Sequence, residues 1–193
     1  TGINFMGRRN RLGSYYPPIV SFLDKTFIQT LEPIEISSGL GEILKMAVIK
    51  DKKLFDIIEK HGKELLDSKF KCNSADEVIS RSIEGMKVEL EPNLWEKNLK
   101  RIVDFGHSFS PIIEMRSITD NSVPTLLHGQ AVTLGVIFCS CVSHIRNIMS
   151  YNDLKRIVKT AKNMGLPTYH PSFTNSLLLL ESLNDTIKHR NGN

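Results

Sequence analysis

Residues 38–49 read SGLGEILKMAVI, and apolar side chains cover almost the whole circumference of the helix that this stretch predicts. A helix that is apolar all round is typical of a protein core. The helical pattern extends in both directions and predicts one long helix over residues 37–61. Two charged residues, Glu42 and Lys45, interrupt the apolar run, and their spacing of three places them on one face of that helix.

Glu42 and Lys45 each need a partner, because an unpaired charge is costly inside a protein. They could simply pair with each other. Alternatively, Glu42 binds a metal ion and Lys45 faces an anionic ligand. The helix alone leaves both alternatives open.

Further helical patterns follow on both sides of this helix. We expect one or two helical turns within residues 25–31 and longer helices at residues 74–90, 106–116, 127–149, 151–164 and 172–189. Ser74 and Asn152 lie where N-caps are expected, and Gly165 precedes Leu166 and Pro167 as a helix stop.

The N-terminal part differs from this helical pattern. Residues 1–16 are rich in Gly, Asn and Arg and predict a loop, and the apolar run at residues 19–24 predicts a buried strand. The predicted fold class is therefore mainly α. We expect residues 36–193 to form a helical domain, and residues 1–35 to be the last strand and turn of a preceding α/β domain.

Two histidines lie beside glycines at predicted helix starts. His107 follows Gly106 in VDFGHSFSP (residues 103–111), and His128 precedes Gly129 in LLHGQAV (residues 126–132). A glycine next to a histidine lets the backbone come close to what the imidazole contacts. Each histidine could be a hydrogen-bonded structural residue. Together with Glu42, however, they would make an N,N,O zinc set with one open position, as in catalytic zinc sites.

Composition narrows the class of protein. The chain has 193 residues, a formal net charge of +4, 40% hydrophobic and 24% charged residues, which indicates an ordinary globular protein. The positive charge is spread without a dense basic stripe, which argues against a nucleic-acid partner and suits phosphorylated metabolites. Near the C-terminus, Lys188, His189 and Arg190 form a small basic cluster that is a candidate phosphate contact.

Targeting signals are not evident in the sequence. The apolar stretches look shorter than the roughly 18 residues of a membrane span, and no basic-then-apolar segment stands at the N-terminus. We therefore expect a cytoplasmic protein without a membrane partner. The chain begins Thr-Gly-Ile-Asn, which is not a translation start, so we expect a piece of a longer protein.

Three motifs in this order resemble those of the dehydroquinate synthase superfamily, the sugar phosphate cyclases: GLGEILK (39–45), FGHSF (105–109) and HGQAV (128–132). The segments EPNLWE (91–96) and VDFGHSFSP are similar to those of the 2-epi-5-epi-valiolone synthase branch, which cyclises sedoheptulose 7-phosphate. Dehydroquinate synthases typically have other residues at the positions of Met86, Lys100, Asp104 and Pro111. These departures favour a different sugar phosphate, with dehydroquinate synthase or a gadusol-type cyclase as the alternatives.

The resemblance implies that residues 36–193 are a metal- and substrate-binding domain and that residues 1–35 are the end of a nucleotide-binding domain. It also implies roles for particular residues. Glu42, His107 and His128 would bind zinc or cobalt, and Lys45, Asp104 and His107 would form the catalytic group. Contacts to NAD are implied for Arg9 and Asn10. We expect the substrate to contact residues implied by the resemblance and two residues of the basic cluster near the C-terminus. These are Asn10, Lys45, Lys100, Asp104, Lys188 and Arg190. The implied reaction is transient oxidation by NAD, phosphate elimination, reduction and aldol ring closure, in a full-length homodimer.

Two departures from the family pattern lead to further expectations. The family motif reads His-Gly-Glu where this chain has Gln130, which predicts a weaker hydrogen bond to a neighbouring ligand. The Gly-rich NAD-binding half expected before Thr1 is not in the sequence, so we expect no NAD binding or turnover by this chain alone. Two alternatives from other functional classes remain. The chain could be a non-catalytic helical fragment, or a zinc hydrolase that uses Asp104 as its general base.

Overall fold

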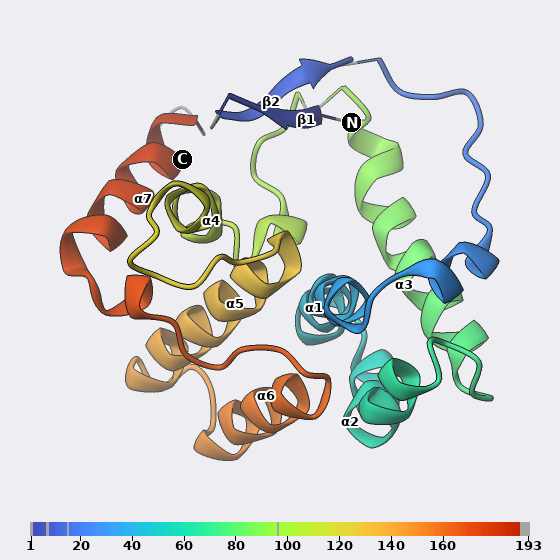
Figure 1. Cartoon of the computed structure of the whole chain (residues 1–193). Coiled ribbons are helices and arrows are strands. Elements are labelled where there is room, and N and C mark those ends of the chain that lie inside the picture. Colours follow the sequence, from blue (N-terminus) through green and yellow to red (C-terminus); the bar gives the residue numbers. More distant parts are fainter. Residues whose placement is uncertain (1, 7, 15, 96, 190–193) are drawn as a thin grey trace.

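The computed structural model describes residues 2–6, 8–14, 16–95 and 97–189, and most of them are helical (Figure 1). The helices are α1 (Pro33–Ile49), α2 (Lys52–Asp67), α3 (Ala75–Leu90), α4 (Ser110–Thr119), α5 (His128–Ile145), α6 (Tyr151–Asn163) and α7 (Ser176–His189). Short 3-10 helices are η1 (Lys25–Thr30), η2 (Glu91–Asn93), η3 (Ile102–Asp104) and η4 (Pro171–Thr174). The predicted mainly α fold class is confirmed.

Helix α1 is the centre of the bundle, as its apolar circumference predicts. It packs against α5, α2 and α3, and Figure 1 shows it end-on with the other helices around it. Leu40 and Leu44 of α1 are fully buried together with Ile58 of α2 and with Val132 and Val136 of α5. A second, smaller apolar cluster joins α4, α5 and α7. The two clusters hold α1, α4 and α5 in a fixed arrangement, and these helices carry the candidate site.

Several predicted helix boundaries are wrong. The single helix expected over residues 37–61 is two helices, because Asp51 accepts a hydrogen bond from the Leu54 N–H at 2.9 Å and starts α2 anew. The N-cap of α6 is Ser150 rather than Asn152, since the Ser150 side chain accepts from the Asp153 N–H. Helix α4 begins at Ser110 rather than near residue 106, because Gly106 has φ +82° and cannot belong to a right-handed helix.

The strand predictions are also wrong. Residues expected as loop form an antiparallel hairpin, β1 (Gly2–Phe5) and β2 (Arg8–Gly13), with Gly2 opposite Gly13. It lies at the opposite end of the bundle from α6 (Figure 1). The run at residues 19–24 forms no strand, and Ile19 and Phe22 are 97% and 93% exposed. Within the described ranges the hairpin strands pair only with each other, so this run has no strand to join. The domain division at residue 35 stays a prediction.

Helix α5 is apolar over more residues than the sequence analysis expected of any stretch, although it is shorter than the helix predicted at residues 127–149. The 18 residues of α5 have a mean hydropathy of 1.2, which by length and composition would suffice to cross a membrane. However, 56% of that helix is buried inside the structure, and core helices of globular domains pass the same test. Its apolar character is explained by its place between α1, α4 and α6.

Candidate metal centre

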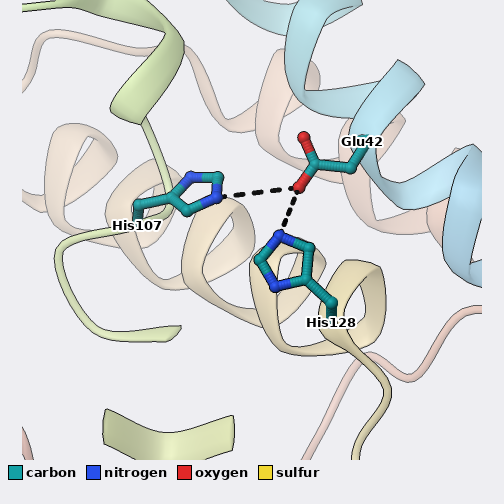
Figure 2. A group of neighbouring side chains, drawn as sticks. All are labelled: Glu42, His107 and His128. Carbon is teal, nitrogen blue, oxygen red and sulfur yellow. Dashed lines mark ion pairs between the residues drawn. The ribbon is translucent and has the colours of Figure 1, made fainter. Parts of the chain in front are cut away.

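Three side chains from separate parts of the sequence meet at one point: Glu42 of α1, His128 at the first residue of α5, and His107 in the turn before α4 (Figure 2). The Glu42 Oε1 lies 3.1 Å from His128 Nε2 and 3.7 Å from His107 Nε2. One ligand atom from each residue lies within 4.8 Å of the others. The sequence predicted this trio, although 65 residues separate its first two members, and the structure brings it together.

Close backbone contacts place the two histidines. Gly106 packs against α5, and a Cβ there would lie 2.9 Å from the Val132 carbonyl oxygen. On the other side, a Cβ at Gly135 would lie 2.2 Å from the Gly106 carbonyl oxygen. The chain before His107 can therefore approach α5 only because both residues are glycines. At His128, the next residue's N–H donates to Ser38 Oγ of α1 at 3.0 Å, which ties the start of α5 to α1.

Glu42 has one oxygen for Lys45 and one for the histidines. Its Oε2 accepts a hydrogen bond from Lys45 Nζ at 2.6 Å, and the Lys45 side chain is only 3% exposed. Its Oε1 is buried and makes no hydrogen bond of conventional geometry with the described residues. Burial raises the pKa of Glu42, but the contact with His128, the hydrogen bond from Lys45 and the nearby charges outweigh burial and lower the pKa to about 2. The pairing of Glu42 with Lys45 is thus confirmed, and it leaves Oε1 for a cation.

His128 lies between two carboxylates. Its Nδ1 is 2.8 Å from Oε2 of Glu114, a buried residue of α4, while its Nε2 faces Glu42. The hydrogen bond to Glu114 and the contact with Glu42 raise the pKa of His128 to about 9. The sequence analysis did not single out Glu114, which contacts the His128 ring. Its signal was a lone charge between Ile113 and Met115, the same kind of signal that identified Glu42.

The donors fit a divalent metal ion. His128 and His107 both turn Nε2 toward Glu42 Oε1, and His107 Nδ1 lies 3.4 Å from the Phe105 carbonyl oxygen. A cation would satisfy the buried Oε1. Two imidazole nitrogens and a carboxylate oxygen are the ligand set of several catalytic zinc sites, which keep another position open.

The other predicted site residues are less closely connected to this centre. Asp104 binds Arg101 at both carboxylate oxygens, with Nε–Oδ2 and Nη2–Oδ1 distances of 3.0 Å. Lys100 and Lys188 are exposed. Arg9 and Asn10 belong to β2, but their side chains lie outside the described part of the structure, as does the whole of Arg190. Their roles stay predictions.

Gln130 does not weaken a hydrogen bond to His128, contrary to the expectation from its motif. Its Oε1 accepts from the Leu127 N–H at 2.9 Å and caps the start of α5. The His128 ring donates from Nδ1 to Glu114 instead.

Comparisons with known proteins identify the family of this chain. The 3-dehydroquinate synthase C-terminal family matches residues 39–188. A 2-epi-5-epi-valiolone synthase of Actinomyces sp is 42% identical over 198 residues, covering 100% of this chain and 50% of the relative. A 3-dehydroquinate synthase of Corynebacterium diphtheriae is 31% identical and covers 98% of this chain and 49% of its own length.

A solved structure shows the same fold. It is ValA, a 2-epi-5-epi-valiolone synthase from Streptomyces hygroscopicus subsp. jinggangensis 5008, with NAD+ and Zn2+ bound. The TM-score is 0.91 at 41% identity, over 100% of this chain and 52% of that one. The chain therefore spans about half the length of the relatives that it matches.

Proposed function

Since the chain belongs to the 3-dehydroquinate synthase C-terminal family, we propose that it is the metal- and substrate-binding half of a sugar phosphate cyclase. The proposed reaction of the whole protein converts sedoheptulose 7-phosphate to 2-epi-5-epi-valiolone with elimination of phosphate, a carbon–oxygen lyase activity. Similarity to two 2-epi-5-epi-valiolone synthases at 41–42% identity, against 31% for a 3-dehydroquinate synthase, supports this choice of substrate.

The convergence of Glu42 Oε1 with the Nε2 atoms of His107 and His128 carries the proposal. We assign these three residues as the ligands of zinc, or of cobalt, which accepts the same donors. A bound metal ion supplies Lewis-acid stabilisation of negative charge on a substrate oxygen, and NAD supplies the transient oxidation.

The protein's own residues would prepare the site for this chemistry. Glu42 is ionised throughout the physiological range, because its pKa is lowered to about 2. Lys45 places a buried positive charge 2.6 Å from Glu42, where it can attract an anionic substrate. Asp104, held by Arg101, is suited to orient a substrate hydroxyl group by accepting its hydrogen bond. The contacts of Arg9 and Asn10 with NAD, and those of Lys100, Lys188 and Arg190 with phosphate, belong to the same proposal.

The test begins with the metal. Zinc per chain is measured by elemental analysis for the parent and for His107→Ala, and circular dichroism checks that both are folded. We expect near-stoichiometric zinc in the parent and its loss in the variant. A folded parent without zinc affinity would refute the metal centre and favour the non-catalytic alternative.

The substrate is tested with the whole protein, supplied with NAD and zinc. Product analysis after incubation with sedoheptulose 7-phosphate should give 2-epi-5-epi-valiolone. A gadusol-type product, or turnover of the 3-dehydroquinate synthase substrate instead, would overturn the assignment within the family. The cytoplasmic location and the homodimer stay predictions, which fractionation and sedimentation would check.

A further inference from the structure

The buried carboxylate of Glu114 contacts the ring of His128 on the side away from Glu42. Its Oε2 lies 2.8 Å from His128 Nδ1, and Glu42 Oε1 lies 3.1 Å from His128 Nε2. We propose that Glu114 is a positioning residue, which holds the His128 ring so that Nε2 faces the metal centre. The inference rests on the metal centre proposed above.

The chemistry of a carboxylate determines which ring nitrogen faces the metal. An ionised carboxylate only accepts hydrogen bonds, so Nδ1 of His128 must carry a proton toward Glu114. In a neutral imidazole the lone pair is then on Nε2, the atom that faces Glu42. Histidine ligands of metals commonly donate their second N–H in this way, which fixes the ring and makes it a better ligand.

Helix α4 holds Glu114 firmly in place. The residue is 5% exposed, and the neighbouring Ile113 is fully buried in the cluster that joins α4, α5 and α7. A buried carboxylate needs a hydrogen-bond partner, and His128 provides one. Glu114 therefore has little freedom to turn away from the ring.

The same turn of α4 also holds the backbone just before His128. Ser117 Oγ donates to the Glu114 carbonyl oxygen at 2.7 Å and accepts from the Leu126 N–H at 3.0 Å. One short segment of α4 thus fixes both the approach of the chain to His128 and the orientation of its ring. A substitution of the Glu114 side chain leaves these Ser117 hydrogen bonds in place, because Ser117 bonds to the main-chain carbonyl of Glu114 and not to its carboxylate.

The experiment measures zinc affinity by competition with a chromophoric chelator for the parent, Glu114→Gln, Glu114→Ala and His128→Ala. Glu181→Gln, an exposed residue of α7, is the matched charge control. We expect about 10-fold weaker binding for Glu114→Gln, about 100-fold for Glu114→Ala, and unchanged binding for Glu181→Gln. Circular dichroism checks folding, and the nearly isosteric Glu114→Gln carries the test if Glu114→Ala does not fold.

Two spectroscopic readouts separate positioning from general stability. The zinc-loaded parent should show a downfield Nδ1–H proton resonance from His128, which Glu114→Ala loses. The cobalt-loaded chain should change its visible absorption in both Glu114 variants but not in Glu181→Gln. Affinities within about twofold of the parent, with the resonance intact, would overturn the role of Glu114 and leave the metal centre standing. Unchanged zinc affinity in His128→Ala would overturn the metal centre and this inference together.

Discussion

Gly41 and Gly129 touch where α1 crosses α5, and this contact sets the distance between Glu42 and His128. A Cβ at Gly41 would lie 2.3 Å from the Gly129 carbonyl oxygen, and one at Gly129 would lie 1.8 Å from the Ser38 carbonyl oxygen. Real Cβ atoms do not approach so closely, so any side chain would push the helices apart. Each glycine is adjacent in sequence to a proposed metal ligand, and the close crossing therefore brings the two ligands within reach of one ion.

Gly129→Ala should accordingly damage both the fold and the metal centre. Overpacking of this kind costs about 1–3 kcal/mol of unfolding free energy, and zinc affinity should fall because His128 moves away from Glu42. Gly39→Ala is the control, because nothing lies within 4 Å of a Cβ there. In that exposed helical position alanine should stabilise by roughly 0.5–1 kcal/mol. Urea denaturation and zinc titration of both variants measure these effects, and equal zinc affinity in Gly129→Ala and Gly39→Ala would contradict the argument.

The boundary between α1 and α2 gives a pH-dependent prediction. Asp51 accepts from the Leu54 N–H at 2.9 Å and from Arg81 Nη1 at 2.8 Å. Burial raises the pKa of Asp51, but these hydrogen bonds and the charge of Arg81 together lower it below its usual value. A carboxyl group with a lowered pKa stabilises the fold above its unfolded-state pKa, and the benefit is lost as the pH falls through the folded-state pKa.

Asp51→Ala should therefore cost about 1–2 kcal/mol at pH 7, as the loss of an N-cap does, and clearly less near pH 3. Asp67→Ala removes a carboxylate at the other end of α2, where Asp67 pairs with Lys63 on the surface, and should cost little at either pH. Urea titrations at both pH values decide the matter. A cost for Asp51→Ala that does not shrink in acid would mean that the charge of Asp51 contributes nothing.

The sequence predicted the metal trio because its signals are local. A charge inside an apolar helix and histidines next to glycines can be read without knowing the fold. The helix break at Asp51 was missed, because apolar residues resume at Leu54 and Phe55 after the charged residues 50–53, and the cap hydrogen bond shows where α2 starts. Residues 19–24 have the composition of a strand, but a strand needs a neighbouring strand, and composition does not reveal one.

The residue that hydrogen-bonds to a metal-binding side chain is harder to predict than the metal-binding side chain itself, as Gln130 illustrates. The motif comparison pointed to position 130 as the hydrogen-bond partner of His128. In the structure that partner is Glu114, and Gln130 instead accepts from the Leu127 N–H at the start of α5. Which side chain reaches the ring depends on how α4 packs against α5, and this long-range packing is not visible in the spacing of residues.

Gln130→Glu should therefore change little. A glutamate can accept the same hydrogen bond from the Leu127 N–H, and a negative charge is favourable in the first turn of a helix. We expect zinc affinity within about threefold of the parent and unfolding free energy within about 1 kcal/mol. Gln130→Ala should lose about 1 kcal/mol with the cap. A tenfold gain in zinc affinity for Gln130→Glu would show that position 130 supports the metal ligands after all.

The roles of Glu42 and Lys45 can be tested separately by substitution, although the two residues form an ion pair. Glu42→Gln removes the proposed ligand and leaves Lys45 buried without its charge partner. Because Glu42 is itself 34% exposed, we expect a loss of about 1–3 kcal/mol, less than for a fully buried pair. Lys45→Met keeps all three ligands, so it should retain zinc while the whole protein loses turnover of the sugar phosphate.

The double variant Glu42→Gln/Lys45→Met completes the comparison. It leaves neither charge of the buried pair, so it should recover most of the stability that Glu42→Gln loses, because that cost comes from a buried charge without its partner. It should not recover zinc, since the carboxylate is still missing. Urea denaturation and zinc analysis of the four proteins therefore give two independent patterns. Zinc loss in Lys45→Met would show that the lysine, and not the carboxylate alone, is needed to form the metal centre, and the division of roles would be wrong.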